Sequence, residues 1–240
     1  MRLVSSVVIA EKSRRFSPKQ GDGNAGFWEM SDGKLVPYSS SIERRFVEIC
    51  DWAPEVRSIQ HEPFRLRFYD EPTQRHRYYT PDYLVGLETS RGDAFRYVIE
   101  VKPYSLYMRK FKADLRGFAN RAIVAGTSYA RNQPGTDFAV VTDRWVESRG
   151  VANIRLIRSA ALRDGDPALA EIMVNRIFTI AGPSLKDLVN EGHVRGYSRA
   201  AVITQVLKMC GCDEVHFDIR QPLSDGSRFY EGARQKVFKI

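Results

Sequence analysis

The sequence has few of the residues that build disulfide frameworks or zinc sites. Its 240 residues include 3 cysteines and 4 histidines. The cysteine count is odd, and Cys210-x-Cys212 has no second pair at the spacing of a zinc finger. We therefore expect the cysteines to be small apolar side chains in a reducing, cytoplasmic compartment.

Long apolar runs and several catalytic motifs are also missing. No run approaches the roughly 20 apolar residues of a membrane span. The stretch 1–10 reaches Glu11-Lys12 without the longer apolar region of a signal peptide, so we expect neither a span nor a signal. There is no Walker motif, no glycine-rich dinucleotide turn, no Ser-His-Asp candidate and no internal repeat.

The sequence has more basic than acidic residues. Lys and Arg number 37 against 29 Asp and Glu, a net charge of +8, while the hydrophobic fraction of 43% is ordinary for a globular protein. A basic excess favours an anionic partner such as nucleic acid, although solubility alone could also account for it.

Hydrophobic periodicity predicts an α/β core after a loosely packed lead-in. The segment 11–40 is rich in Gly, Ser, Pro and Arg and has little periodicity. A helix then begins after Ser39-Ser40, with Ile42, Phe46 and Ile49 on its apolar face, and Pro54 ends it. The segments that follow are predicted as three strands, a helix and two strands: 56–69, 78–88, 94–101, 107–121, 138–141 and 154–157. This order indicates a mixed sheet with a crossover helix.

The chain changes character near 163–167, a polar stretch with Gly and Pro. Beyond it we expect three helices and two strands, at 168–180, 184–191, 198–210, 215–219 and 228–230. Three helices and a β-hairpin match a winged helix-turn-helix, which is used for DNA and for protein contacts. The predicted organisation is thus a lead-in (1–40), an α/β domain (41–163) and a winged-helix-like domain (164–240).

Two carboxylates and a lysine occupy adjacent predicted strands. Glu100 and Lys102 share one strand face, and Asp82 starts the preceding strand directly after Pro81. Antiparallel pairing through the turn at 90–93 would bring the carboxylates together. Close carboxylates repel unless a cation lies between them, and hard oxygen ligands suit Mg²⁺. The lysine could then orient or deprotonate a water and stabilise charge on a phosphate. The alternative is a cross-strand salt bridge worth about 0.5 kcal/mol.

Glu43 is the candidate third acid, because the first helix could lean it toward the sheet edge. A capping box with Ser40 as N-cap explains Glu43 equally simply, and the two roles need not exclude each other. Glu48 is the competing acid, expected on a solvated face.

This arrangement resembles the PD-(D/E)xK nuclease superfamily, with Glu43 on the first helix, Pro81-Asp82 on one strand and Glu100-Val101-Lys102 on the next. The closer resemblance is to the TnsA-type endonuclease subunit of heteromeric transposons. It rests on these motifs, on the flanking phrases Gln60-His61-Glu62-Pro63 and Tyr79-Thr80, and on the two-domain length. Residues 40 to about 160 carry the resemblance.

The resemblance implies a restriction-endonuclease-like core followed by a small winged-helix-like domain. It makes Glu43, Asp82 and Glu100 the metal-side acids, for Mg²⁺ with Mn²⁺ as a substitute, and Lys102 the catalytic lysine. Some relatives have glutamine at the position of Glu100, where this chain follows the general superfamily pattern. The implied function is a prokaryotic, cytoplasmic DNA endonuclease that cuts the 5′ ends of a transposon in cut-and-paste transposition. Its partners would be a transposase subunit that cuts and joins the 3′ ends and an ATPase regulator, the latter through the C-terminal domain.

Two other functions stay open at this point. One is a stand-alone restriction, repair or junction nuclease of the same superfamily, and the other is a non-catalytic DNA-binding adaptor whose acids form surface salt bridges. Metal-dependent nicking separates the enzymes from the adaptor.

Basic residues crowd the predicted helix 107–121. Arg109, Lys110, Lys112, Arg116 and Arg121 could meet DNA phosphates, or could form a solvated face around an apolar stripe. Arg75-His76-Arg77-Tyr78-Tyr79 alternates cations with aromatics, although tyrosines in a strand usually pack. His61 and His76 are weaker candidates for supporting groups near the acids.

Overall fold

A computed structural model of the chain describes residues 4–12, 24–88, 92, 94–109, 117–233 and 238. It consists of two compact units. The first contains Met1–Asp51, Glu55–Val146 and Phe238–Ile240, and the second contains Trp52–Pro54 and Glu147–Val237. Within the described residues, no helix is long and apolar enough to cross a membrane.

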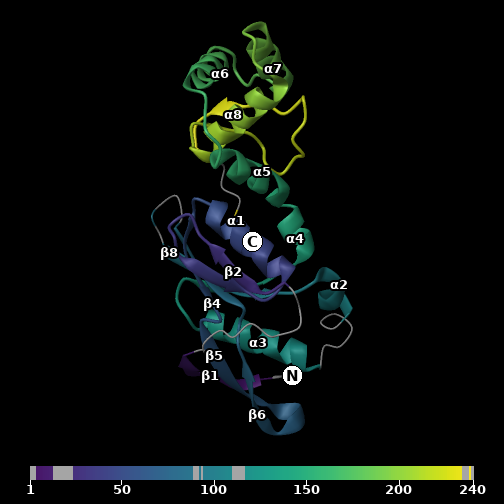
Figure 1. Cartoon of the computed structure of the whole chain (residues 1–240). Coiled ribbons are helices and arrows are strands. Elements are labelled where there is room, and N and C mark those ends of the chain that lie inside the picture. The colour runs from purple at the N-terminus through teal and green to yellow at the C-terminus, as the bar shows by residue number, and fades with distance from the viewer. Residues whose placement is uncertain are drawn as a thin grey trace. The chain divides into compact units, whose positions relative to one another are not determined.

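The first unit is a mixed α/β fold built on two sheets (Figure 1). A four-stranded sheet has the order β4-β7-β8-β9, in which β8 and β9 are parallel and the other pairs antiparallel. A three-stranded antiparallel sheet has the order β1-β5-β6, and β2 pairs with β3 as a separate hairpin. The strands are β1 Val4–Lys12, β2 Gly26–Glu29, β3 Leu35–Tyr38, β4 Val56–His61, β5 Phe64–Asp70, β6 Arg75–Tyr79, β7 Tyr83–Glu88, β8 Ala94–Val101 and β9 Thr136–Val141. The mixed sheet fits the expected restriction-endonuclease-like core.

Four helices accompany these sheets: α1 Ser41–Trp52, α2 Tyr104–Tyr107, α3 Phe118–Arg131 and α4 Asp143–Glu147. The predicted first helix is confirmed: Phe46 and Ile49 are fully buried, and the helix ends two residues before Pro54. Of the predicted helix 107–121 the structure describes the two ends: α2 ends at Tyr107 and α3 begins at Phe118. Residues 110–116 lie outside the described part.

Helix α3 is the crossover between the parallel strands β8 and β9, and it also packs on the three-stranded sheet. Its buried side chains include Ala122, Ala125 and Ala130, which allow a close approach to Phe68 and Tyr79 of that sheet. A Cβ at Gly126 would lie 2.5 Å from the Phe138 ring and 3.0 Å from the Tyr79 ring. Small residues on α3 thus bring both sheets into one core.

Several sequence predictions need correction. The predicted strand 56–69 is two strands, because Glu62 adopts φ 41° and turns the chain between β4 and β5. The lead-in (1–40) contains β1 and the β2–β3 hairpin. The prediction of a strand at 154–157 is wrong: Ile154 and Ile157 lie one helical turn apart on the buried face of α5.

The second unit contains the helices α5 Val151–Ala161, α6 Pro167–Thr179, α7 Leu185–Val194 and α8 Arg199–Gly211, and the strands β10 Val215–His216 and β11 Tyr230–Glu231. The three helices predicted after residue 167 are confirmed. The side chain of Asp166 accepts from two backbone N–H groups of α6, and Ser184 and Ser198 cap α7 and α8. The predicted strands shrink to two residues each.

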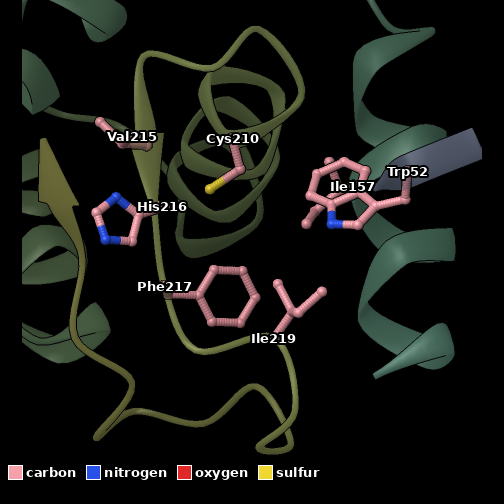
Figure 2. Close-up of a pocket in the computed structure, with 7 residues that line it drawn as sticks. All are labelled: Trp52, Ile157, Cys210, Val215, His216, Phe217 and Ile219. Atoms are coloured by element: carbon pink, nitrogen blue, oxygen red, sulfur yellow. The ribbon is translucent and has the colours of Figure 1, made fainter. Parts of the chain in front are cut away.

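The core of the second unit forms where α5 and α8 pack together. This core encloses a small cavity of about 10 Å³. Figure 2 shows Ile157, Cys210 and Phe217 among the side chains that line it. The sequence placed a domain joint near 163–167, but there the structure has the short connection from α5 to α6. The compact units divide between Val146 and Glu147.

Candidate active site

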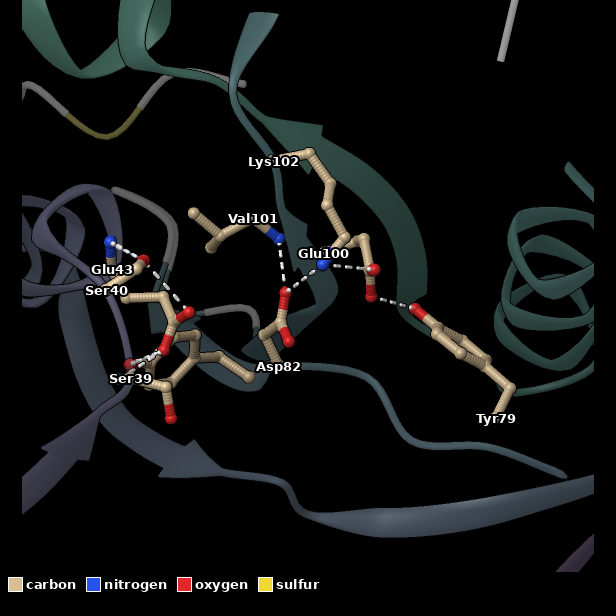
Figure 3. Close-up of polar contacts among 9 residues, drawn as sticks. Ser39, Ser40, Glu43, Tyr79, Asp82, Glu100, Val101 and Lys102 are labelled. Atoms are coloured by element: carbon tan, nitrogen blue, oxygen red, sulfur yellow. Dashed lines mark hydrogen bonds and ion pairs between the residues drawn. The ribbon is translucent and has the colours of Figure 1, made fainter. Parts of the chain in front are cut away.

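Asp82 and Glu100 meet at one end of the β7–β8 pair (Figure 3). The register Tyr83↔Ile99 brings Asp82, just before β7, beside the last residues of β8. Oδ2 of Asp82 accepts a hydrogen bond of 2.6 Å from the backbone N–H of Val101. The antiparallel geometry that the sequence predicted from the turn at 90–93 is therefore present.

Lys102 bridges the two carboxylates. Its Nζ lies 2.9 Å from Oε1 of Glu100 and 3.5 Å from Oδ2 of Asp82. Burial lowers the pKa of Lys102, but Asp82 and Glu100 outweigh this effect, so the pKa of the ammonium is raised overall. The lysine is thus a protonated cation between two acids.

Asp82 has the electrostatics of a carboxylate crowded by other acids. Burial raises the pKa of Asp82 well above its usual range, and the charges of Glu100 and Glu43 raise it further, while Lys102 and the Val101 N–H lower it. A carboxylate in this position gains from any additional cation, because the cation relieves the repulsion.

Tyr79 fixes the orientation of Glu100. The Tyr79 hydroxyl donates a hydrogen bond of 2.7 Å to Oε2 of Glu100 inside the core. Burial and the charge of Glu100 raise the pKa of Tyr79 well above its usual value, so it remains a donor. Sequence reasoning treated this tyrosine as packing. No local pattern reveals its role, because the two residues belong to different sheets.

Glu43 caps the start of α1 in the structure. Its carboxylate accepts from the backbone N–H of Ser39 at 2.8 Å and from the Ser40 hydroxyl at 3.0 Å. The Glu43 N–H donates to Ser40 Oγ at 3.2 Å, which completes a box-like arrangement. The Tyr83 hydroxyl lies 3.4 Å from the same carboxylate. Glu43 is close enough to Asp82 to influence its pKa, so capping and a site role coexist geometrically.

The expectation that Glu48 lies on a solvated face is wrong. Its side chain is 1% exposed and forms an ion pair of 3.1 Å with Arg44 one turn earlier on α1. The i,i+4 spacing places the arginine over the acid and allows the burial.

The donor chemistry of the site suits a hard cation. Asp82 and Glu100 offer carboxylate oxygens, which are the ligands that Mg²⁺ prefers. Among the residues that the structure describes, however, no group of three His, Cys, Asp or Glu side chains is arranged to hold a metal ion. The Lys102 ammonium instead neutralises the pair. A metal could use this donor set only if the ammonium moved away from the two oxygens.

The predicted DNA-contacting helix is described only at its ends. Arg109 is exposed, whereas Lys110, Lys112 and Arg116 lie outside the described residues. Arg121 does not face solvent: its Nε lies 2.5 Å from Oδ1 of the fully buried Asp70.

The two histidines that were considered as supporting groups lie on β4 and β6. The ring of His61 packs edge-on against Tyr83, with 5.2 Å between centroids, and burial lowers the pKa of His61 to about 4. His76 packs edge-on against Tyr69 on the other sheet, with 5.4 Å between centroids.

Comparison with known proteins identifies the segment that carries these residues. The family described as TnsA-like endonuclease N terminal matches residues 53–150, which include Tyr79, Asp82, Glu100 and Lys102 and begin after Glu43. No match was found among curated proteins. Residues 53–150 are therefore similar to the N-terminal domain of TnsA-like endonucleases, and the resemblance to a TnsA-type endonuclease is confirmed.

Proposed function

We propose that this chain is the Mg²⁺-dependent endonuclease subunit of a heteromeric transposase, which cuts DNA at the 5′ ends of a transposon. The observation that carries the proposal is the convergence of Asp82, Glu100 and Lys102 at one end of the β7–β8 pair, inside a TnsA-like endonuclease domain. The net charge of +8 suits a DNA substrate.

Asp82 and Glu100 would hold the metal, with Glu43 as a third acid. A bound Mg²⁺, or Mn²⁺ in its place, would neutralise charge on the scissile phosphate and acidify a water. The hydrogen bond from Tyr79 keeps one oxygen of Glu100 fixed, so the free rotation of this carboxylate is reduced. The Val101 N–H does the same for Asp82.

Lys102 would act as a protonated group. Because its pKa is raised, the ammonium suits orienting a water and stabilising the charge that develops on the phosphate better than it suits accepting a proton. The bridge to Asp82 and Glu100 would open as the acids receive another cation. The Lys102 side chain, which is 30% exposed, could then reach the substrate.

The second unit would bind partner proteins. We propose a winged-helix-like role for α6–α8 with β10–β11 and contact with an ATPase regulator, while the transposase subunit that cuts the 3′ ends works alongside. Exposed apolar side chains support a protein contact: Phe178 is 53% exposed and Val194 86% exposed. We also propose that the protein acts on DNA in the prokaryotic cytoplasm.

The experiment is metal-dependent nicking of a supercoiled plasmid that carries transposon ends. We expect nicks with Mg²⁺ or Mn²⁺ and none with chelator, and we expect the transposase subunit to focus the cuts at the 5′ ends. Efficient cutting that needs no partner would support a stand-alone nuclease instead. Absence of nicking with both metals and with the partner would overturn the enzyme proposal in favour of an adaptor.

A further inference from the structure

We propose that the outer face of the β5–β6 hairpin binds the sugar-phosphate backbone of DNA, at a place separate from the acids. This face, called the hairpin face below, consists of Arg65, Arg67, Tyr69, His76 and Tyr78. The inference rests on the proposed function in one respect: DNA is taken to be the substrate.

Strand alternation gathers these side chains on one side of the sheet. Along β5, Phe64, Leu66 and Phe68 are buried, whereas Arg65, Arg67 and Tyr69 alternate with them and are exposed or half-buried. The register pairs Arg67 with Tyr78 and Tyr69 with His76, so the residues of β6 continue the same face.

Tyr78 and Tyr79 show the two sides of β6. Tyr79 is 7% exposed and reaches Glu100, whereas Tyr78 is 44% exposed on the opposite side. The guanidinium of Arg65 lies 3.9 Å from the centroid of the Tyr78 ring. The sequence-based view that these tyrosines pack is therefore correct for Tyr79 only. Tyr78 presents an aromatic surface to solvent with a cation already stacked on it.

The positive charge of the hairpin is left largely uncompensated. On the hairpin face, Arg67 is exposed and has no ion-pair partner within the part of the chain that the structure describes. On the other side of β6, the exposed Arg75 also has none among those residues. The nearby Asp70 is fully buried and already neutralised by Arg121 at 2.5 Å and by Arg77 at 3.6 Å. Arginines on the hairpin face favour an anionic partner.

The chemistry of the hairpin face fits DNA better than an acidic protein surface. Guanidinium groups bind phosphate oxygens through paired hydrogen bonds, and an exposed tyrosine can pack its ring against a sugar and donate its hydroxyl to a phosphate. The combination of arginines with interleaved aromatic rings matches both parts of the sugar-phosphate backbone. An acidic peptide would use the arginines but leave the Tyr78 ring without a specific partner.

The hairpin face is close to the acids along the chain. β6 leads through Tyr79, Thr80 and Pro81 directly to Asp82, so the face and the acids are connected by a few residues of extended chain. Tyr78 and Glu100 lie on opposite sides of β6. The part of the DNA that contacts the hairpin face would therefore differ from the part whose scissile phosphate lies at the acids.

A structural alternative exists for the cations of β6. β6 is an edge strand of the three-stranded sheet, and cationic side chains on an edge strand protect it from pairing with other chains. This alternative predicts that loss of the charges causes self-association without loss of DNA affinity.

The test measures binding of a fluorescent DNA duplex to the full chain in chelator, where cutting is absent. The variants are R65Q/R67Q and Y78A for the hairpin face, and R75Q for the edge strand. The matched control is R57Q, because Arg57 is an exposed arginine that Glu88 already neutralises at 2.5 Å. We expect R65Q/R67Q to bind about 10-fold more weakly and to lower the magnitude of the salt slope by about two, since each lost phosphate contact removes about 0.9. Y78A should weaken binding by several-fold, and R57Q by less than twofold.

Light scattering and thermal melting of the same preparations complete the test. Unchanged DNA affinity and salt slope in R65Q/R67Q would overturn the inference, and self-association of R75Q would then support edge protection by β6. Failure of the proposed function is distinguishable: D82N should keep the affinity of the unmodified chain in chelator, whether or not the chain cuts. Loss of nicking therefore says nothing against the hairpin face.

Discussion

The Tyr79 hydroxyl donates a hydrogen bond of 2.7 Å to Oε2 of Glu100 across two different sheets. Tyr79 ends β6 of the three-stranded sheet, and Glu100 lies near the end of β8 of the four-stranded sheet. The bond therefore joins the packing of the sheets, with α3 between them, to the orientation of a candidate metal ligand. Sheet packing and site geometry are coupled through this one contact.

Tyr79→Phe should lower nicking without unfolding the domain. Loss of a hydrogen bond to a charged group costs about 1.5–3 kcal/mol, and we expect about tenfold slower nicking together with a higher Mg²⁺ requirement. The matched control is Tyr78→Phe, which removes a hydroxyl from the exposed neighbour and should leave the Mg²⁺ dependence unchanged. An unaltered Mg²⁺ titration of Tyr79→Phe would show that this tyrosine does not position Glu100.

Glu43→Gln separates the capping role from the metal role. Glutamine keeps one oxygen that can accept from the Ser39 N–H, and its NH₂ group can donate to the Ser40 hydroxyl oxygen, so the melting temperature in chelator should change little. Loss of the negative charge should abolish nicking if Glu43 binds metal. Full nicking by this variant would leave Glu43 as a cap only.

Phe238→Ala should destabilise the first unit. The buried Phe238 ring packs with 5.7 Å between centroids against Trp145 and 5.9 Å against Phe46, and its N–H donates to Glu55 at 2.6 Å. Truncation of a buried phenylalanine costs about 3–5 kcal/mol. Urea unfolding followed by tryptophan fluorescence would measure the loss, with Phe178→Ala as a control because that ring is 53% exposed. A change below about 1 kcal/mol would contradict this packing.

His61 should make the fold less stable in acid. Burial lowers the pKa of His61 from 6.5 to about 4, so the unfolded chain binds a proton between these pH values that the folded chain refuses. Stability should therefore fall as the pH drops from about 6.5 to 4, and above 6.5 this residue has no effect. His61→Gln should flatten the pH dependence of the melting temperature in this window. The measurement is the difference in melting temperature between the unmodified chain and His61→Gln at each pH. The carboxylates contribute equally to both proteins, so their effect cancels in this difference.

The sequence predicted the parts of the site that follow from local rules. Asp82 and Glu100 could be placed together because strand alternation and hairpin pairing depend only on neighbouring segments. Tyr79 could not be assigned, because its contact depends on how β6 packs against β8. The exposure of Tyr78 depends on the same packing, so the sequence could not predict it either.

The failures elsewhere have physical causes of the same kind. The apolar residues at 154–157 form too short a run to separate strand from helix, although Val151, Ile154 and Ile157 have helical spacing. Glu48 was expected in solvent because it is charged. Its burial depends on Arg44, one turn earlier on α1, and on the elements that cover the helix.

The central claim is that Asp82, Glu100 and Lys102 form a metal-dependent nuclease site. The most direct measurement is nicking of a supercoiled plasmid by Asp82→Ala and Lys102→Ala, beside DNA binding and melting temperature of the same preparations. The account predicts no nicking by either variant in Mg²⁺ or Mn²⁺, with folding and DNA affinity close to those of the unmodified chain. Nicking by either variant at close to the unmodified rate would contradict it.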